Sequence, residues 1–174
     1  MTEPEIRLLL RITARTSFLL FAVAFAAGGL RALWPGKLTG WVARNSDRFL
    51  LGFAASHTVH LGLVITLLST LTVIPRREIY ALVLGGFVFV LIYALTAAAI
   101  ARSMGYKQLA LIGSAGFTSF AMYTIWLVFA LGFVPRIIKG WPIYSVLGAL
   151  ALAAILFRIA GQARKSRAAS AGAA

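Results

Sequence analysis

The sequence predicts an all-α integral membrane protein, a bundle of five transmembrane helices. Of its 174 residues, 61% are hydrophobic and 12% are charged, and the mean hydropathy is +0.92. A soluble domain usually carries about twice that share of charge. Five helices of ~20 residues would use ~100 residues and leave ~70 for loops and ends. This composition excludes a soluble enzyme, a disordered chain and, because Cys is absent, a disulfide scaffold or an iron–sulfur protein.

Five apolar runs meet the length that a bilayer crossing requires, and in lipid each must be helical to satisfy its own backbone hydrogen bonds. They cover residues 16–33, 49–73, 79–101, 109–134 and 142–157. Aromatic residues of the interfacial kind stand near the ends of the runs: Trp34, Trp41, Tyr106 and Trp141. A cleaved signal peptide is the alternative for the first run, but Glu3 and Glu5 do not suit its basic start.

The expected organisation is a transmembrane domain over residues 1–161 and a small, basic tail over 162–174. The composition of the tail predicts disorder. With five crossings, the two ends of the chain face opposite sides of the membrane. Ten Lys and Arg fall on the side of the tail and seven on the side of the amino terminus. The positive-inside rule therefore predicts that the N-terminus lies outside and the C-terminus in the cytoplasm.

The net charge of +13 is distributed in a way that favours the lipid bilayer over nucleic acid as a partner. The 17 Lys and Arg residues are scattered among the breaks between the apolar runs and form no dense stripe. Basic residues at the ends of spans are typical of multispanning proteins, where they meet anionic lipid headgroups.

The acidic residues avoid the interior of the predicted spans. All four lie outside the runs or at their edges, at Glu3, Glu5, Asp47 and Glu78. Ion-coupled transporters usually carry an ionisable group in mid-membrane as a relay or counter-ion, so ion-coupled transport is disfavoured. A hydrolase is disfavoured as well, because neither paired carboxylates nor a Ser/His/Asp set is present.

The only two His residues of the chain, His57 and His60, stand in the second run. Counted from Phe49 at ~1.5 Å per residue, His57 lies ~12 Å deep and His60 ~16 Å deep, near the midplane. At i and i+3 they share one helix face, so they cannot bind one haem iron from opposite sides. Each is expected to face the bundle interior and to find a partner. Two interpretations stay open: haem or metal ligation by one of them, or a structural His hydrogen-bonded to a Ser or Thr of a neighbouring helix.

The fourth run carries a second set of polar side chains, which are Ser114, Thr118, Ser119, Tyr123 and Thr124. Helix packing is the default explanation of such a stripe, and the wall of a cofactor pocket is the alternative. Leu109 begins its span on the same membrane side as Phe49. Counted from Leu109, Tyr123 lies ~21 Å deep and is therefore roughly level with His60.

Four stretches of the sequence together resemble a known family. They are TARTSFLL at 13–20, RFLLG at 48–52 followed by VHL at 59–61, LTAAA at 95–99 leading through RSMGYKQL at 102–109, and YTIW at 123–126. In this order they resemble the ferric reductase-like transmembrane domain family. Within that family they are most similar to the haem-binding membrane subunit of bacterial periplasmic methionine sulfoxide reductase systems.

The resemblance implies a b-type haem and electron transfer, with His60 matching a haem ligand of the family. The family's two His on the fourth span, thirteen residues apart, correspond here to Ala110 and Tyr123. The resemblance therefore implies one haem on His60, with His57 beside it and either Tyr123 or an open position on the other side of the iron. Met122 ranks below Tyr123 because it points to a different flank of the helix. The chain has no flavin or nicotinamide domain, so a separate partner protein would deliver the electrons.

Three function hypotheses follow. The first is a ferric-reductase-like electron-transfer subunit with a single haem, which as an enzyme would be part of a membrane oxidoreductase. The second is a relative that has lost its haem and acts as a structural or partner-binding membrane subunit. The third is an unrelated small transporter or channel-like protein. An absorption spectrum, co-purification of a partner and substrate flux in liposomes would distinguish the three.

Overall fold

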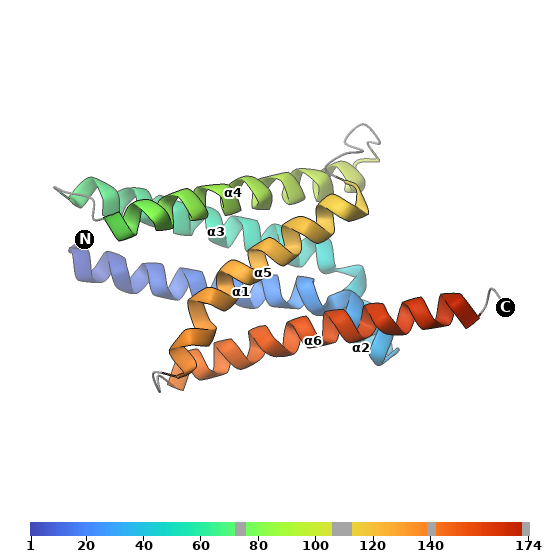
Figure 1. Cartoon of the computed structure of the whole chain (residues 1–174). Helices are drawn as coiled ribbons and strands as arrows, with labels where there is room; N and C mark the ends of the chain where they lie inside the picture. The colour runs from blue at the N-terminus through green and yellow to red at the C-terminus, as the bar shows by residue number, and fades with distance from the viewer. Residues whose placement is uncertain (72–75, 106–112, 139–141, 172–174) are drawn as a thin grey trace. The chain divides into compact units, whose positions relative to one another are not determined.

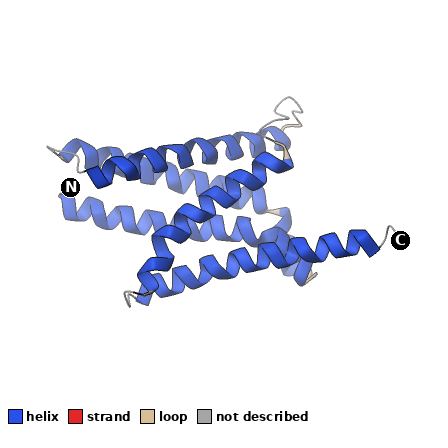
Figure 2. Ribbon diagram, in the orientation of Figure 1, coloured by secondary structure: helices blue, strands red, loops and turns tan. Residues whose placement is uncertain are grey.

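The protein is helical throughout the part that the structure describes. The computed structural model describes residues 1–71, 76–105, 113–138 and 142–171, apart from the side chains of residues 77, 78 and 81. Within these ranges there are six helices and no strand (Figures 1 and 2). The helices are α1 Glu3–Leu33, α2 Lys37–Arg44, α3 Ser46–Thr70, α4 Arg76–Ser103, α5 Ala115–Ile137 and α6 Pro142–Ala171. The predicted all-α class is confirmed.

Five of the described helices are long and apolar enough to cross a membrane, and only the eight-residue α2 is not. They contain from 22 to 31 residues, counting α4 from Leu82. At ~1.5 Å per residue, even the shortest reaches ~33 Å, slightly more than the ~30 Å of a hydrocarbon core. The five predicted membrane-spanning helices are confirmed, and the chain is an integral membrane protein.

Large apolar side chains face outward on all five long helices. Examples, with exposed fractions between 46% and 70%, are Leu19, Val59, Val83, Leu131 and Leu156. In water, so much exposed apolar surface would lead to aggregation. Lipid tails cover such surface without cost, which agrees with the composition of the spans.

By contacts, the chain divides into two compact units. Unit 1 consists of Met1–Leu19 and Leu50–Ile125, and unit 2 of Leu20–Phe49 and Trp126–Ala174. In unit 1, α3 and α4 run side by side (Figure 1), and the hydroxyls of Thr58 and Tyr93 hydrogen-bond between them at 2.9 Å. The largest fully buried side chains of unit 1 are Ile6, Phe18, Phe53, Ile92, Leu95, Ile125 and the small polar Ser17.

Unit 2 has an aromatic core and one very close helix contact. Phe21, Phe25, Trp126, Phe129, Phe133 and Tyr144 form a connected series of ring contacts in it. The indole N–H of Trp126 on α5 donates to the carbonyl of Ala151 on α6 at 2.9 Å, which links these two helices. On α1 and α6, Gly29 and Gly161 bring the backbones together so closely that a Cβ on either glycine would collide with the other helix.

The first and last spans are longer as helices than their apolar runs. Helix α1 begins at Glu3, not at residue 16, and an ion pair between Arg7 and Glu3 (2.7 Å) supports its first turns. The predicted disorder of residues 162–174 is wrong as far as Ala171, because α6 continues to that residue. Its last turns are rich in Ala, Arg, Lys and Gln, which are among the strongest helix formers, and Gly161 is its last glycine before Ala171.

The remaining boundaries agree with the expected ones within three residues, with one exception. The predicted start of the fourth span at Leu109 is wrong for residues 113–114, which are not helical, and α5 begins at Ala115. Helix α3 begins at Ser46 and α4 at Arg76, each three residues before the predicted start, and α5 continues through Pro135 to Ile137. Residues 72–73 of the second predicted span and 109–112 of the fourth lie outside the described residues, and so do Tyr106 and Trp141. Ala110 is one of these undescribed residues. The short α2 was not predicted; it occupies the segment between the first two spans.

Candidate functional site

The two His side chains lie together on α3, in unit 1. Their ring centroids are 5.1 Å apart and the ring planes are inclined by 17°, so the rings are stacked. His57 is 8% exposed, and His60 is half-buried. The i, i+3 spacing that places both on one face of a helix explains this arrangement. The expectation that the pair shares one inward-directed face is confirmed.

Aromatic side chains surround His57. The ring of Phe53, one turn earlier on α3, lies 5.3 Å away, and the ring of Phe89 on α4 lies 4.7 Å away. Tyr93 follows one turn after Phe89 and stacks on it at 6.2 Å, while its hydroxyl meets Thr58. These rings keep water from the side of the pair on which His57 lies.

His60 has a polar partner on a neighbouring helix. Its Nδ1 lies 2.9 Å from the hydroxyl of Thr13 on α1. The same hydroxyl is within donor distance of two carbonyls of its own helix, those of Leu9 at 2.9 Å and Leu10 at 3.2 Å. The backbone of Leu10 is a further hydrogen-bond partner of the His60 ring. Both partners of this ring therefore come from α1.

A second polar pair lies one helical turn away. The hydroxyls of Ser17 on α1 and Ser56 on α3 are 2.9 Å apart, and Ser17 is fully buried. Ser17 follows Thr13 by four residues, whereas Ser56 precedes His60 by four. The two helices are thus antiparallel here, and their facing polar positions coincide. We call these four residues, Thr13, Ser17, Ser56 and His60, the polar seam.

The third predicted site residue, Tyr123, lies half-buried on α5, also in unit 1. Its neighbour Met122 is buried. The pairing of Tyr123 with His60 across a haem stays a prediction. In the stripe on this helix, Ser114 has a local structural role, because its hydroxyl accepts from the backbone N–H of Phe117 at 3.1 Å and so caps the start of α5.

Sequence reasoning missed Thr13 as the partner of His60. Thr13 lies before the predicted start of the first span, and it entered the sequence analysis only within the stretch 13–20. The available signal was a pair of matched spacings, Thr13 with Ser17 and Ser56 with His60, which suits two antiparallel helices. Phe89 was missed as well, because nothing in an apolar run distinguishes one Phe from its neighbours.

The site offers few donors for a metal ion. In the ranges that the structure describes, no three His, Cys, Asp or Glu side chains gather as a metal-binding group. A haem needs less from the protein, because the macrocycle supplies four nitrogens and the protein only the axial ligands. No protein-family model, no curated protein and no solved structure matches the chain.

Proposed function

We propose that the chain is a ferric-reductase-like electron-transfer subunit of a bacterial inner membrane and holds one b-type haem on Nε2 of His60. The observation that carries the proposal is the hydrogen bond of 2.9 Å between Thr13 and Nδ1 of the same ring. A His that ligates a metal through one nitrogen almost always has its other nitrogen bonded to a carboxylate, a carbonyl or water, which orients the ring. Thr13 is in the position to act in this way.

The hydroxyl of Thr13 also bears on the tautomer of His60. A hydroxyl has a single proton, and the carbonyl of Leu9 lies in the usual acceptor position for a Thr in a helix. If that proton goes to Leu9, the hydroxyl oxygen is left to accept, and Nδ1 of His60 must be the donor. Nε2 then keeps its lone pair, which is the state that an axial ligand requires.

The residues around the two His side chains suit a haem pocket, because they are aromatic. Phe53 and Phe89 enclose His57, and the stack of the two His rings restricts the rotation of His60. A haem bound there would supply one-electron transfer. Tyr123 is our candidate for the opposite face of the iron, with an open position as the alternative and Met122 ranked below both. Electrons would come from a separate donor protein.

A haem-free structural or partner-binding subunit is the second candidate. The polar seam favours it, because two interhelical hydrogen bonds match four buried or half-buried polar side chains without any cofactor. Such pairs stabilise membrane helix contacts by about 0.6 kcal/mol on average. This candidate predicts a protein without haem absorbance that co-purifies with a partner.

The test is the absorption spectrum of the detergent-purified full-length protein from cells supplied with a haem precursor. We expect a Soret band in the wild-type protein and in His57→Ala, and its loss in His60→Ala and His60→Gln. Gln can still bond to Thr13, so His60→Gln separates a lost ligand from a lost helix contact. Helical content by circular dichroism and a monodisperse elution profile establish that each variant is folded. A folded wild-type protein without a Soret band would contradict the proposal and leave the haem-free subunit.

A further inference from the structure

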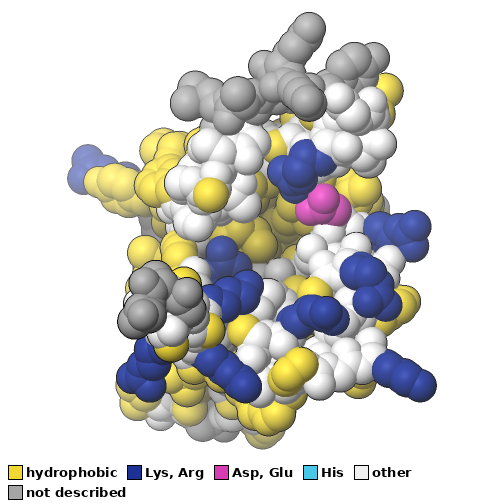
Figure 3. Space-filling view, turned by 90° about the vertical axis from the view of Figure 1, so that its right-hand side faces the viewer, with side chains coloured by type: hydrophobic (Ala, Val, Ile, Leu, Met, Phe, Trp, Pro, Cys, Tyr) yellow, Lys and Arg dark blue, Asp and Glu magenta, His cyan; other side chains and the backbone are white. Residues whose placement is uncertain are grey.

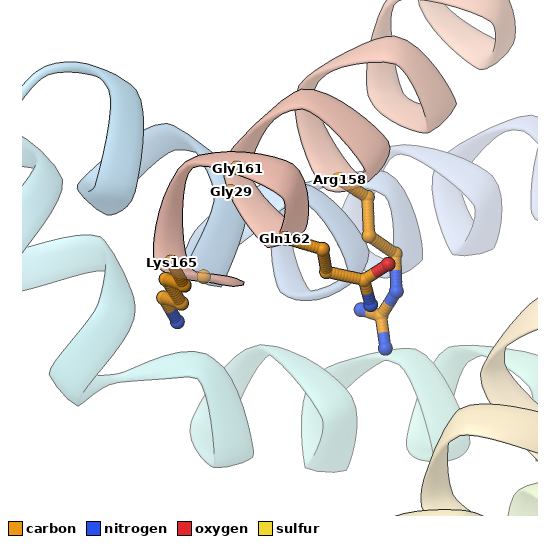
Figure 4. Close-up of a pocket in the computed structure, with 6 residues that line it drawn as sticks. Gly29, Arg158, Gly161, Gln162 and Lys165 are labelled. Atoms are coloured by element: carbon orange, nitrogen blue, oxygen red, sulfur yellow. The ribbon is translucent and has the colours of Figure 1, made fainter. Parts of the chain in front are cut away.

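A small cavity lies in unit 2, between the last turns of α1 and the second half of α6. Its volume is about 130 Å³, and it is lined by Gly28, Gly29, Arg158, Gly161, Gln162 and Lys165. Figure 4 shows Arg158, Gln162 and Lys165 extending from α6 with Gly161 in the helix between them. A cavity needs roughly 10–15 Å³ to hold one water molecule, so this one has room for a polyatomic anion.

The lining has two cationic side chains and no acidic one. The surroundings of the cavity within unit 2 are also mostly basic. Residues 28–49 and 158–171 carry the basic side chains of Arg31, Lys37, Arg44, Arg48, Arg158, Arg164, Lys165 and Arg167. The same two segments contain a single acid, Asp47. Figure 3 shows a face on which Lys and Arg side chains are common and acidic ones scarce. An anion would be attracted to this part of unit 2.

Contacts with α1 hold two basic side chains of α6, those of Arg158 and Arg164. The guanidinium of Arg158 donates from Nη1 to the carbonyl of Phe25 at 2.9 Å and lies 4.6 Å above the Phe25 ring. Arg164 donates from Nη1 to the carbonyl of Leu33 at 2.7 Å, at the end of α1. Arg158 is therefore already positioned in the cavity wall, so that little further ordering would be needed to bind a ligand.

Glycines create the space. Gly29 and Gly161 let the two backbones touch, which fixes α6 against α1 at this level. Gly28 also lines the cavity, and a Cβ placed on it would meet no atom within 4 Å. A larger side chain at Gly28 would therefore fill the cavity without disturbing the helix contact.

The cavity lies where the apolar part of α6 ends. Arg158 is the first charged residue of that helix. At ~1.5 Å per residue, Arg158 lies ~24 Å from Pro142 along the helix, and Lys165 lies ~35 Å from Pro142. These depths place the cavity at the boundary between the hydrocarbon core and the headgroups. Beside it, Trp34 packs edge-on against Phe157 at 5.4 Å, and Trp is typical of that boundary.

From this combination of charge, volume and depth, we propose that the cavity binds the phosphate of an anionic phospholipid headgroup. Arg158 and Lys165 provide the charge, and the amide of Gln162 provides a further hydrogen-bond donor. Free phosphate has the same chemistry, but the depth of the cavity favours a phosphate whose acyl chains lie along the apolar part of α6. The proposal is independent of the haem proposal, because all six lining residues belong to unit 2.

The test is native mass spectrometry of the full-length protein titrated with dioleoyl phosphatidylglycerol, with dioleoyl phosphatidylcholine and inorganic phosphate as separate arms. We expect one phosphatidylglycerol to bind about tenfold more tightly than phosphatidylcholine. Lys165→Gln should weaken it about fivefold, whereas the matched control Lys37→Gln, an exposed Lys of α2 outside the lining, should change it less than about twofold. Gly28→Leu should abolish the binding. Gly132→Leu, at an equally open glycine of α5, should leave it unchanged.

Three results would overturn the proposal. Equal losses in Lys165→Gln and Lys37→Gln would mean that surface charge as a whole attracts the lipid. Unchanged lipid binding in Gly28→Leu would mean that the cavity is not the site. Binding of inorganic phosphate that responds to Lys165→Gln and Gly28→Leu, without any preference for phosphatidylglycerol, would assign the site to a free anion. Gly28→Leu and Gly132→Leu must elute alike, and Lys165→Gln provides the test if Gly28→Leu fails to fold.

Discussion

At the scale of single residues, the two imidazole rings on α3 have different partners although they are only three positions apart. His57 is enclosed by Phe53 and Phe89, whereas His60 meets the hydroxyl of Thr13. Aromatic neighbours restrict the rotation of a buried imidazole ring and exclude water from it. A polar partner on one ring nitrogen fixes the direction in which the second ring nitrogen points. In the proposed function, this division makes His60 the ligand and His57 part of the wall.

The first prediction concerns Thr13. Thr13→Val keeps the shape of the side chain but removes the hydroxyl that bonds to Nδ1 of His60. Because loss of such a partner typically costs 10–100-fold in metal affinity, we expect about tenfold weaker haem retention. The measurement is the haem-to-protein ratio after repeated gel filtration. Thr16→Val is the matched control, since the only hydrogen bond described for Thr16 goes to the carbonyl of Ile12 in its own helix. Equal haem loss in both variants would show that Thr13 does not orient the ligand.

Tyr123 gives the second prediction, which rests on the proposed haem. Tyr123→His would place a second His at the position where the resemblance to the ferric reductase-like family implies one. With His60 on one face and either Tyr123 or an open position on the other, the wild-type spectrum should be high-spin or mixed-spin. The variant should shift toward the low-spin spectrum of bis-His coordination, as read by electron paramagnetic resonance. An unchanged spin state in a folded, haem-containing variant would remove Tyr123 from the pocket.

At the scale of helices, the contact between α1 and α6 in unit 2 depends on two glycines. A Cβ on Gly161 would run into the backbone of Gly29, and one on Gly29 would run into that of Phe157. In membranes, where the hydrophobic effect does not drive helices together, such close backbone approach is a main source of helix association. The two residues therefore position the helix that carries Arg158.

The third prediction follows from this contact. Gly161→Ala should force α6 away from α1 and lower the free energy of unfolding by about 1–3 kcal/mol, as overpacking does elsewhere. The change is measured as a lower midpoint of thermal unfolding in detergent. Gly132→Ala, where a Cβ meets nothing within 4 Å, serves as the control and should be neutral or slightly stabilising. Equal midpoints for the two variants would mean that the helices do not rely on this contact.

The helices also show what the sequence could and could not predict. Hydropathy placed all five spans, because a bilayer crossing needs an apolar run of fixed minimum length. It did not find the helical segments beyond the apolar runs, such as Glu3–Arg15 and Gln162–Ala171. In these segments the helices continue through charged and polar residues, which lower the mean hydropathy without ending a helix.

Only the part of the site that lies on a single helix was predictable from the sequence. The i, i+3 spacing placed His57 and His60 on one face, whereas the bond between His60 and Thr13 depends on the register of two antiparallel helices. Register is a tertiary property, so no local pattern states it. The cavity at Gly28 was likewise hidden, since it needs α6 to remain helical beyond Phe157, through residues partly expected to be disordered.

At the scale of the whole molecule, five spans imply that the two ends of the chain lie on opposite sides of the membrane. The basic residues divide ten to seven between the two sides, with the larger number on the side of α2 and the end of α6. By the positive-inside rule we propose that this side is cytoplasmic.

The fourth prediction tests this orientation. A green fluorescent protein fused after Ala174 should be fluorescent, since it folds in the cytoplasm. An alkaline phosphatase fused after Pro75, between α3 and α4, should be active, since it needs the periplasm. A second phosphatase fusion after Ala174 is the control and should be inactive. Activity of that control would contradict the proposed orientation.

The most direct test of the central claim is the haem content of the purified wild-type protein. The full-length chain is expressed in cells supplied with a haem precursor, purified in detergent, and its haem is measured as the pyridine haemochrome against protein from amino-acid analysis. The proposal that His60 holds a single b-type haem predicts a ratio of about one haem per chain. A ratio near zero in folded protein would contradict it. A ratio near two would do so as well, because the described part of the chain offers only one pair of His, on one face of α3.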